Sequence, residues 1–218
     1  MKVLVLLSGG MDSTSLLYAM NDEHDVLGAL SFHYGSKHND RELHYASYHC
    51  QQLGIDHKVI PLDFIAEHFT SDLLLSGGEI PEGHYESANM SKTVVPFRNG
   101  IMLSIAAGYA ESIGADAVSI AAHSGDHAVY PDCRDSFMEA FQSAIKLGTY
   151  AQIELHSPFV GIRKEDIALI GHQHGVDFSM TYSCYKGGET HCGKCGTCVE
   201  RKEAFEISKI TDPTQYLA

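Results

Sequence analysis

Hydrophobic and polar positions along the chain alternate between short apolar runs and stretches with apolar residues at helical spacing. The first apolar run is rich in leucine and valine and ends in glycines, and a helical pattern follows it. Gly54 marks the end of a second helical stretch. The predicted elements are, in order, a strand over residues 2–7, a helix over 13–20, a strand over 26–32, a helix over 40–53 and a strand over 57–62.

The second half of the chain continues this alternation after a long interruption. Residues 71–93 are polar, contain glycine and have no period, which predicts a long loop and suggests a lid. The later predicted elements are a helix over residues 98–113, a strand over 117–121, a helix over 135–147, an extended segment over 153–156, a helix over 164–174 and a last helix around 199–208. This alternation predicts an α/β fold, a doubly wound and mostly parallel sheet with ligands bound at the carboxyl ends of its strands.

Composition indicates a folded protein with a hydrophobic core. The chain has 218 residues, of which 44% are apolar and 20% are charged. These fractions are typical of globular proteins and exclude a disordered chain, a collagen and a coiled coil. A chain of this length buries most of its unfolded surface without disulfides, so we expect one domain that carries a small appendage.

Charge and hydropathy argue against two classes of partner. The 15 basic and 28 acidic residues give a net charge of −13, and no run of Lys or Arg is long enough to follow a phosphate backbone. We therefore expect no direct binding to nucleic acid. The longest apolar stretch, Val3–Leu7, is far shorter than the roughly 20 residues of a membrane helix. No association with a membrane is expected, and the sequence predicts a cytoplasmic protein.

A glycine-containing turn follows the first predicted strand, where backbone N–H groups and a helix N-terminus can converge on an anion. Its glycines let the chain approach a phosphate, its serines add hydroxyl donors, and its aspartate can hold Mg²⁺ against phosphate oxygens. It lacks the lysine of a Walker loop and the three spaced glycines of a dinucleotide loop. A simple turn with a helix cap is the alternative. The candidate nucleotide-binding residues are Ser8, Gly9, Gly10, Asp12 and Ser13.

Four of the six cysteines are crowded near the end of the chain, separated by seven, two and two residues. A reducing cytoplasm favours metal ligands over disulfides, and four thiolates describe a closed, structural zinc site. An iron–sulfur cluster is the rival interpretation, because serial two-residue separations also occur in ferredoxins. We favour Zn²⁺ and expect the neighbouring His191 to lie outside the ligand set. The candidate metal ligands are Cys184, Cys192, Cys195 and Cys198.

With these motifs the chain resembles a known family. The loop over residues 8–13 is similar to the SGGxDS signature of the PP-loop ATP pyrophosphatases, which adenylate a substrate and release pyrophosphate. Further motifs resemble the QueC family of these enzymes over nearly the whole chain. They are Tyr34-Gly35 with Glu42, the segment over residues 95–99, the segment over residues 130–134 and the cysteine cluster.

The resemblance implies a fold, an activity and a set of partners. Residues 1–180 should form a nucleotide-binding PP-loop domain of the adenine nucleotide alpha hydrolase type, and residues 181–218 a zinc-binding segment packed on it. The implied enzyme is a carbon–nitrogen ligase that uses ATP and Mg²⁺ to convert 7-carboxy-7-deazaguanine and ammonia into 7-cyano-7-deazaguanine. It passes through an adenylated acid and an adenylated amide, acts on small molecules in queuosine biosynthesis and forms a homodimer.

Two further segments supply candidates for substrate binding. Arg98 and Asn99 begin a helix after the long loop, where an arginine fork suits a carboxylate or phosphates. A rigid segment offers an aromatic ring in Tyr130, an acceptor in Asp132 and a donor in Arg134, which together could bind a guanine-like edge. An internal ion pair between Asp132 and Arg134 is the alternative.

Lys164 is the last candidate, at the start of a predicted helix. The family resemblance implies that it contacts ATP phosphates and stabilises charge during adenylation. Together with Asp12 and Arg98 it completes the candidate catalytic residues. The alternative is an ordinary solvated lysine that pairs with Asp166.

Departures from the family pattern leave other functions open. Ser36 stands where the family usually has Gln, and Phe97 where it usually has Gly. Ala122-His123 replaces a usual Gly-Val. These departures are compatible with an enzyme that stops at the amide, 7-amido-7-deazaguanine. The cysteines are compatible with a PP-loop enzyme that thiolates tRNA, and the nucleotide loop with a protein that binds nucleotide without turnover.

Overall fold

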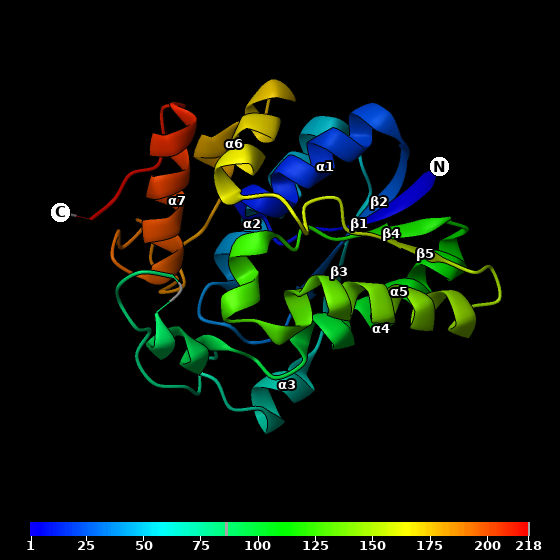
Figure 1. Cartoon of the computed structure of the whole chain (residues 1–218), viewed down its shortest axis with the longest axis horizontal. Coiled ribbons are helices and arrows are strands. Elements are labelled where there is room, and N and C mark those ends of the chain that lie inside the picture. Colours follow the sequence, from blue (N-terminus) through cyan, green and yellow to red (C-terminus); the bar gives the residue numbers. More distant parts are fainter. Residues whose placement is uncertain (86, 218) are drawn as a thin grey trace.

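A sheet of parallel strands runs through the centre of the protein, in the order β3-β2-β1-β4-β5 (Figure 1). The computed structural model describes residues 1–85 and 87–217. The strands are β1 (Lys2–Leu6), β2 (Asp25–His33), β3 (His57–Pro61), β4 (Ala117–Ser119) and β5 (Glu154–His156). The predicted α/β fold with a doubly wound, parallel sheet is confirmed.

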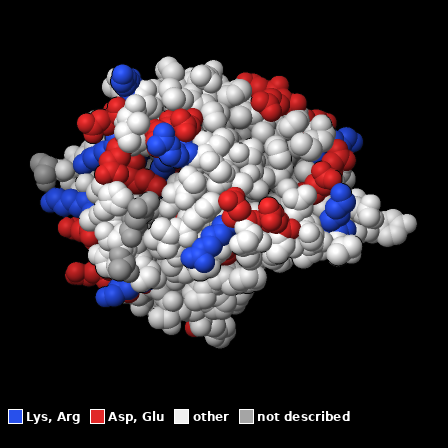
Figure 2. Space-filling view, viewed as in Figure 1, with Lys and Arg blue, Asp and Glu red and all other residues white. Residues whose placement is uncertain are grey.

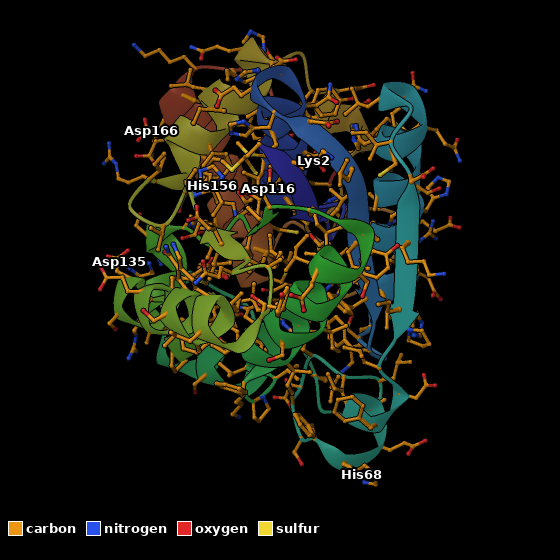
Figure 3. All side chains as sticks on the ribbon, turned by 90° about the vertical axis from the view of Figure 1, so that its right-hand side faces the viewer. Lys2, His68, Asp116, Asp135, His156 and Asp166 are labelled. Carbon is orange, nitrogen blue, oxygen red and sulfur yellow. The ribbon has the colours of Figure 1, made fainter. Side chains whose placement is uncertain are left out.

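Helices cover both faces of this sheet. The helices are α1 (Met11–Glu23), α2 (Asn39–Leu53), α3 (Asp63–His68), α4 (Arg98–Ile113), α5 (Asp135–Gly148), α6 (Lys164–Gln173) and α7 (Gly196–Ser208). Helices α1, α2 and α6 form one layer, α4 and α5 form the other, and α7 packs beside α6 (Figure 1). In Figure 3, Asp166 of α6 and Asp135 of α5 lie on opposite sides of the strands.

The side chains of β1 explain why both faces are covered. Val3 and Val5 belong to the apolar cluster that contains side chains of α1 and α2, whereas Leu4 and Leu6 belong to the cluster that contains side chains of α4. All four side chains are buried. A strand that is buried on both faces requires an unbroken apolar run, and residues 3–7 supply it.

The long segment after β3 has more structure than the sequence pattern predicts. Its first element is the short helix α3, which was not predicted. The Lys37 ammonium group donates hydrogen bonds to the carbonyl oxygens of Leu74 and Gly78, at 2.7 and 2.9 Å. A strand bridge also joins Ser36 to Leu74, whose side chain is fully buried. The first part of this segment is therefore fixed against the loop that leads into α2.

A fully buried arginine attaches α7 to the rest of the chain. Arg201 donates hydrogen bonds to the Phe178 carbonyl oxygen at 3.0 Å and to the Thr181 hydroxyl at 2.8 Å. Its Nε also lies 3.3 Å from Oδ1 of Asp212. One side chain thus contacts the segments that come before and after α7, so its removal should affect the whole C-terminal segment.

Arg201→Leu is expected to lower the free energy of unfolding by about 3–5 kcal/mol, because it leaves the Asp212 carboxylate without its cation and buried acceptors without a donor. Urea unfolding followed by circular dichroism measures the change. Lys58→Met removes a cation from an exposed position of β3 and should change stability by less than about 0.5 kcal/mol. An Arg201→Leu protein as stable as that control would show that the buried contacts contribute nothing.

On the face shown in Figure 2, Lys and Arg are interspersed with Asp and Glu, so no patch of one sign dominates it. None of the helices among the described residues combines the length and the apolar character that crossing a membrane requires.

Lys2 and Asp116 lie side by side at the amino ends of β1 and β4, where the Lys2 backbone N–H donates to Oδ2 of Asp116 at 2.7 Å (Figure 3).

Candidate active site

The glycine turn after β1 is shaped to surround an anion. The hydroxyl oxygens of Ser8 and Ser13 lie 2.9 Å apart, and the Ser8 backbone N–H donates to the Ser13 hydroxyl at 3.1 Å. Gly9 has a φ of +93°, and a Cβ at this position would overlap the carbonyl oxygen of Glu42 in α2. Only glycine therefore fits between the turn and α2. The turn leads directly into the N-terminus of α1 at Met11.

A buried lysine connects this turn to α7. Lys164 places Nζ 3.0 Å from Oδ2 of Asp12 and 2.7 Å from Oε2 of Glu200. Burial alone would raise the pKa of Asp12, but the surrounding basic groups, of which Lys164 has the largest effect, together hold that pKa below its ordinary value. Asp166, the alternative partner considered from the sequence, lies instead 4.0 Å from Nε of Arg163. Lys164 therefore points toward the nucleotide turn.

Asp12 has a second buried neighbour, His123. The His123 Nδ1 atom accepts the Gly125 backbone N–H at 3.1 Å, so the ring hydrogen is on Nε2. That Nε2 lies 3.9 Å from Oδ2 of Asp12 and 3.6 Å from Oδ1 of Asp126. Oδ1 of Asp12 is buried and has no hydrogen-bond partner among the described residues. With Glu200, three carboxylates surround one lysine, so the charge and the oxygen donors fit a divalent cation.

Three predicted substrate-binding residues, Arg98, Asn99 and Tyr130, line one cavity together with the nucleotide turn. Arg98 donates from Nη1 to the Tyr34 hydroxyl at 2.9 Å, and its guanidinium carbon lies 5.4 Å from the centre of that ring. The Tyr130 hydroxyl lies 3.2 Å from the Tyr185 hydroxyl. The cavity therefore combines an arginine fork and aromatic hydroxyls with an anion-binding turn.

The other two predicted substrate-binding residues do not line this cavity. Asp132 is buried, and its Oδ2 accepts the Asn99 backbone N–H at 2.8 Å, so the carboxylate satisfies a free donor at the start of α4. Arg134 is exposed and donates from Nε to the His127 carbonyl oxygen at 3.0 Å. Both side chains are described, and no ion pair joins them. The acceptor expected in the cavity at Asp132 is therefore engaged with the backbone of α4.

Of the positions that depart from the family pattern, Ala122 lines the cavity, whereas Ser36 and Phe97 do not. Phe97 has a φ of +54°, in the left-handed region that favours glycine. Its half-exposed ring packs at a right angle to Phe137 of α5, with centroids 5.8 Å apart. Ser36 is buried, and Ala122 lines the cavity wall. Aromatic packing thus offsets part of the cost of the left-handed conformation at Phe97.

The four cysteines lie together, with all of their sulfur atoms buried within 4.8 Å of one another. The backbone N–H groups of Lys194 and Cys195 donate to the Cys192 sulfur at 3.4 and 3.3 Å. Gly193 takes a φ of +70° in the turn between them. His191 is outside the cluster, and its Nε2 accepts a backbone N–H at 3.0 Å. Four converging sulfur atoms and N–H groups that point at them fit a tetrahedral metal site.

Sequence patterns alone do not identify three residues that the fold brings to the site. Glu200 reaches Lys164 from α7, and Glu42 lines the cavity from α2. Tyr185 reaches Tyr130 from the position directly after Cys184. The Glu42 position belongs to a motif of the resembled family, but only its contact with the cavity shows what it faces. For Glu200 and Tyr185, nothing in the neighbouring sequence indicates that they contact a residue far away in the chain.

The Glu42 carboxyl group has an unusual electrostatic environment. Its side chain is 15% exposed, and the Nε2 atom of His38 lies 3.5 Å from its Oε2. Burial raises the pKa of Glu42 to about 8, and burial lowers the pKa of His38 to about 3. His38 is therefore uncharged at neutral pH and supplies no cation, so Glu42 retains a proton over much of the neutral range.

Glu42→Gln is expected to gain stability relative to the wild type as the pH rises from about 5 to about 8. The unfolded chain releases the Glu42 proton near its ordinary pKa of about 4.3, whereas the folded chain holds it until about pH 8, so wild-type stability falls across this window. The upper limit is about 1.4 kcal/mol per pH unit. Denaturant unfolding of both proteins at the two pH values measures it. Parallel pH profiles would show that Glu42 titrates normally.

The fold and the site together define a class of protein. A parallel sheet whose first βα turn is a Ser-Gly-Gly-Met-Asp-Ser loop, with a buried lysine at that loop, is typical of ATP-binding α/β proteins of the PP-loop class. The chain belongs to the QueC family, because the family model described as "Queuosine biosynthesis protein QueC" matches residues 2–209.

Individual proteins are similar over nearly the full length of this chain. A 7-cyano-7-deazaguanine synthase of Porphyromonas gingivalis is 56% identical over 213 residues, which cover 98% of this chain and 96% of that protein. A 7-cyano-7-deazaguanine synthase of Desulfotalea psychrophila is 52% identical over 214 residues, which cover 98% of each. The solved structure of an NMN synthetase from Francisella tularensis has a TM-score of 0.48 at 13% identity, over 96% of this chain and 77% of that one.

Proposed function

We propose that this protein is an ATP-dependent carbon–nitrogen ligase that converts 7-carboxy-7-deazaguanine and ammonia into 7-cyano-7-deazaguanine in queuosine biosynthesis. Relatives named for the synthesis of that nitrile are 56% and 52% identical to this chain over nearly its whole length. The observation that carries the proposal is the single cavity that joins the nucleotide turn to Arg98 and the tyrosine hydroxyls. A reaction between an acid and ATP requires both reactants in one cavity.

The chemistry explains why these two groups of residues belong together. A carboxylate is a poor acyl donor, because its oxygen is a very poor leaving group. In the first round the carboxylate attacks the α-phosphorus of ATP, pyrophosphate leaves, and ammonia displaces AMP to give the amide. In the second round the amide oxygen attacks the α-phosphorus of another ATP and pyrophosphate leaves. AMP is then eliminated, and the nitrogen has given up both of its protons in forming the nitrile. One cavity can serve both rounds, since each begins with an oxygen at the same phosphorus.

The nucleotide turn is assigned to the phosphates of ATP. Its backbone N–H groups and hydroxyls meet the N-terminus of α1, where a negative charge is stabilised. Lys164 lies at this turn, so its ammonium group can stabilise the charge that develops on the departing pyrophosphate. The phosphate-binding residues of this proposal are Ser8, Gly9, Gly10 and Ser13.

Asp12 is assigned to the Mg²⁺ that accompanies ATP. Its buried Oδ1 atom has no hydrogen-bond partner among the described residues, and Asp126 and Glu200 bring further carboxylate oxygens close to it. When bound, Mg²⁺ neutralises charge on the phosphate oxygens. Asp12 would orient the phosphates through that charge, and Lys164 would keep Glu200 as its partner while Asp12 binds the cation.

Arg98, Asn99 and Tyr130 are assigned to the deazapurine acid, because all three line the cavity wall. The Arg98 guanidinium is held by Tyr34 and presents its remaining donors to a ligand oxygen. Asp132 contributes as a positioning residue, since it fixes the backbone of Asn99. We assign no ligand contact to Arg134, because it does not line the cavity.

The cysteine cluster is assigned to a structural Zn²⁺. Four sulfur ligands leave no open coordination position for a substrate. Cys133, which lines the cavity, does not suit sulfur transfer to tRNA, because burial raises the pKa of its thiol and keeps it protonated. A colourless protein with one zinc per chain supports this assignment, and absorption in the visible range would indicate an iron–sulfur cluster instead.

The experiment that tests the function is mass analysis of the products formed from 7-carboxy-7-deazaguanine, ATP, Mg²⁺ and an ammonium salt. We expect the nitrile, AMP and pyrophosphate. Accumulation of the amide would identify an enzyme that stops after the first round. Binding of ATP without any release of pyrophosphate would identify a nucleotide-binding protein and would overturn the proposed activity.

We also infer a homodimer that works in the cytoplasm on small molecules. An aromatic cluster supports the dimer, because the half-exposed Phe97 ring packs on Phe137, and Phe137 stacks on Phe141 with centroids 5.2 Å apart. Such surface clusters often mark protein interfaces. Light scattering measures the oligomeric state. A monomer at micromolar concentration would contradict this part of the proposal.

A further inference from the structure

A carboxyl group in the wall of the active-site cavity forms no ion pair with a Lys or Arg among the residues that the structure describes. Glu42, in the first turn of α2, lines the cavity, and Nε2 of the neutral His38 ring lies 3.5 Å from its Oε2. Arg98 lines the same cavity, but its guanidinium is bound to the Tyr34 hydroxyl, and no ion pair joins it to Glu42 although the structure describes both. Glu42 and Arg98 therefore face the same space without a direct ion pair, and the positive charge of Arg98 offsets only part of the effect of burial on the pKa of Glu42.

This arrangement is costly in the free protein. A nearly buried carboxyl group that lacks a cation and a full set of hydrogen bonds destabilises the fold. The cost is offset when a ligand supplies the missing donors. The chain could place an apolar side chain at this position of α2 without losing any contact to the nucleotide turn, because α2 packs against Gly9 through its backbone.

The 7-deazaguanine ring offers a complementary set of groups. A guanine-type edge presents two neighbouring donors, the ring N1–H and the 2-amino group, followed by one acceptor, the ring carbonyl oxygen. The two oxygens of an ionised carboxylate match the two donors, so the Glu42 carboxyl group, which holds a proton in the free protein, releases that proton when the ring binds. A guanidinium matches the acceptor. Glu42 and Arg98 are an acceptor and a donor on the same cavity, and aromatic rings of Tyr130 and Tyr185 lie in its wall.

We propose that Glu42 is the specificity-determining residue of this site, and that its carboxylate accepts the N1–H and 2-amino hydrogens of the deazaguanine ring while Arg98 donates to the ring carbonyl. This inference rests on the proposed function. It transfers to Glu42 the role that the sequence suggested for Asp132, whose carboxylate is bound to the Asn99 backbone and does not line the cavity. An adenine-type or hypoxanthine-type ring would leave one or both oxygens of Glu42 without a donor.

Calorimetric binding of two ligands tests the inference. The first is 7-carboxy-7-deazaguanine, and the second is the matching 7-carboxy-7-deazahypoxanthine, which lacks only the 2-amino group. We expect the wild type to bind the first at least about 100-fold more tightly, because loss of one donor leaves a buried carboxylate oxygen unpaired. In Glu42→Gln the preference should fall below about 5-fold, since an amide offers only one acceptor oxygen to this edge.

Three controls make the result specific. The affinity of Glu42→Gln for ATP should stay within about 3-fold of that of the wild type. Glu67→Gln, which alters an exposed glutamate of α3, should leave the affinity for both deazapurines unchanged. Asp132→Asn should weaken both deazapurines equally, as expected of a residue that only positions Asn99. Glu42→Ala, which keeps no acceptor, should also lose the preference and serves as a second variant should Glu42→Gln fold poorly.

The outcomes separate this inference from the proposed function. A wild type that forms the nitrile and a Glu42→Gln protein that still prefers the 2-amino ligand by about 100-fold would overturn the role of Glu42 alone. Weakening of both deazapurines by the same factor, or of ATP instead, would likewise place Glu42 elsewhere in the mechanism. A wild type that binds neither deazapurine would overturn the proposed function and the inference together.

Discussion

Asp12→Ala is expected to slow pyrophosphate release by about 10³-fold or more, the scale of losing one charge-stabilising group from a catalytic site. Asp12 supplies a buried oxygen that has no hydrogen-bond partner among the described residues and that we assign to the cation, and its other oxygen contacts Lys164. The variant should remain folded, because Lys164 keeps its contact with Glu200. A coupled assay for pyrophosphate in the presence of the acid and ATP measures the rate.

The matched control is Asp63→Ala, which removes an exposed carboxylate from the short helix α3, away from the cavity. Its rate should equal that of the wild type. Thermal unfolding of both variants excludes a loss of structure as the cause. Turnover by Asp12→Ala at more than a tenth of the wild-type rate would show that the turn after β1 does not hold the cation.

Cys195→Ser is expected to lose zinc and folded structure together. Three sulfur ligands bind the metal far more weakly than four, and metal binding and folding of such a site are one equilibrium. Cys195 precedes α7 directly, so α7 and the buried Arg201 should lose their anchor. Metal analysis after desalting should give well under one zinc per chain, and the midpoint of thermal unfolding should fall by about 10 °C or more, since a loss of 1 kcal/mol lowers it by about 2–4 °C.

Cys50→Ser is the matched control, because Cys50 is a buried cysteine of α2 that lies outside the cluster. It should keep the full zinc content. If Cys195→Ser kept its structure and stability but lost turnover, the metal would have a catalytic role and its assignment as a structural ion would be wrong. Retention of both zinc and turnover would show that Cys195 is not a ligand.

The fold was predictable because its signals are local. The apolar run of β1 is buried on both faces, and Gly54 and Gly114 end their helices in the left-handed conformation that glycine adopts easily. The short helix α3 escaped prediction, because six residues are too few to show a helical period. Packing against the rest of the protein, rather than a local pattern, stabilises such short elements.

The candidate site was predictable only in part. The nucleotide turn and the cysteines carry their chemistry in consecutive or closely spaced residues, so spacing identified them as candidates. The contact of Glu200 with Lys164 joins α7 to α6 and depends on the packing of those two helices. Asp132 was predicted to bind the substrate because of its residue type and its neighbours in sequence, but its carboxylate accepts a hydrogen bond from the backbone of α4 instead. The type of a residue indicates which interactions its side chain can make, but only the fold shows which group it contacts.

The parallel arrangement of the strands has a practical consequence for handling the protein. The nucleotide turn follows the carboxyl end of β1, whereas Met1 lies at the opposite rim, directly before Lys2 and close to Asp116. At the other terminus, the Leu217 backbone N–H donates to the His191 carbonyl oxygen at 2.8 Å, within the segment that carries the cysteines. A purification tag or an immobilisation anchor therefore belongs on the first residue, where it obstructs neither the entrance to the cavity nor the metal-binding end of the chain.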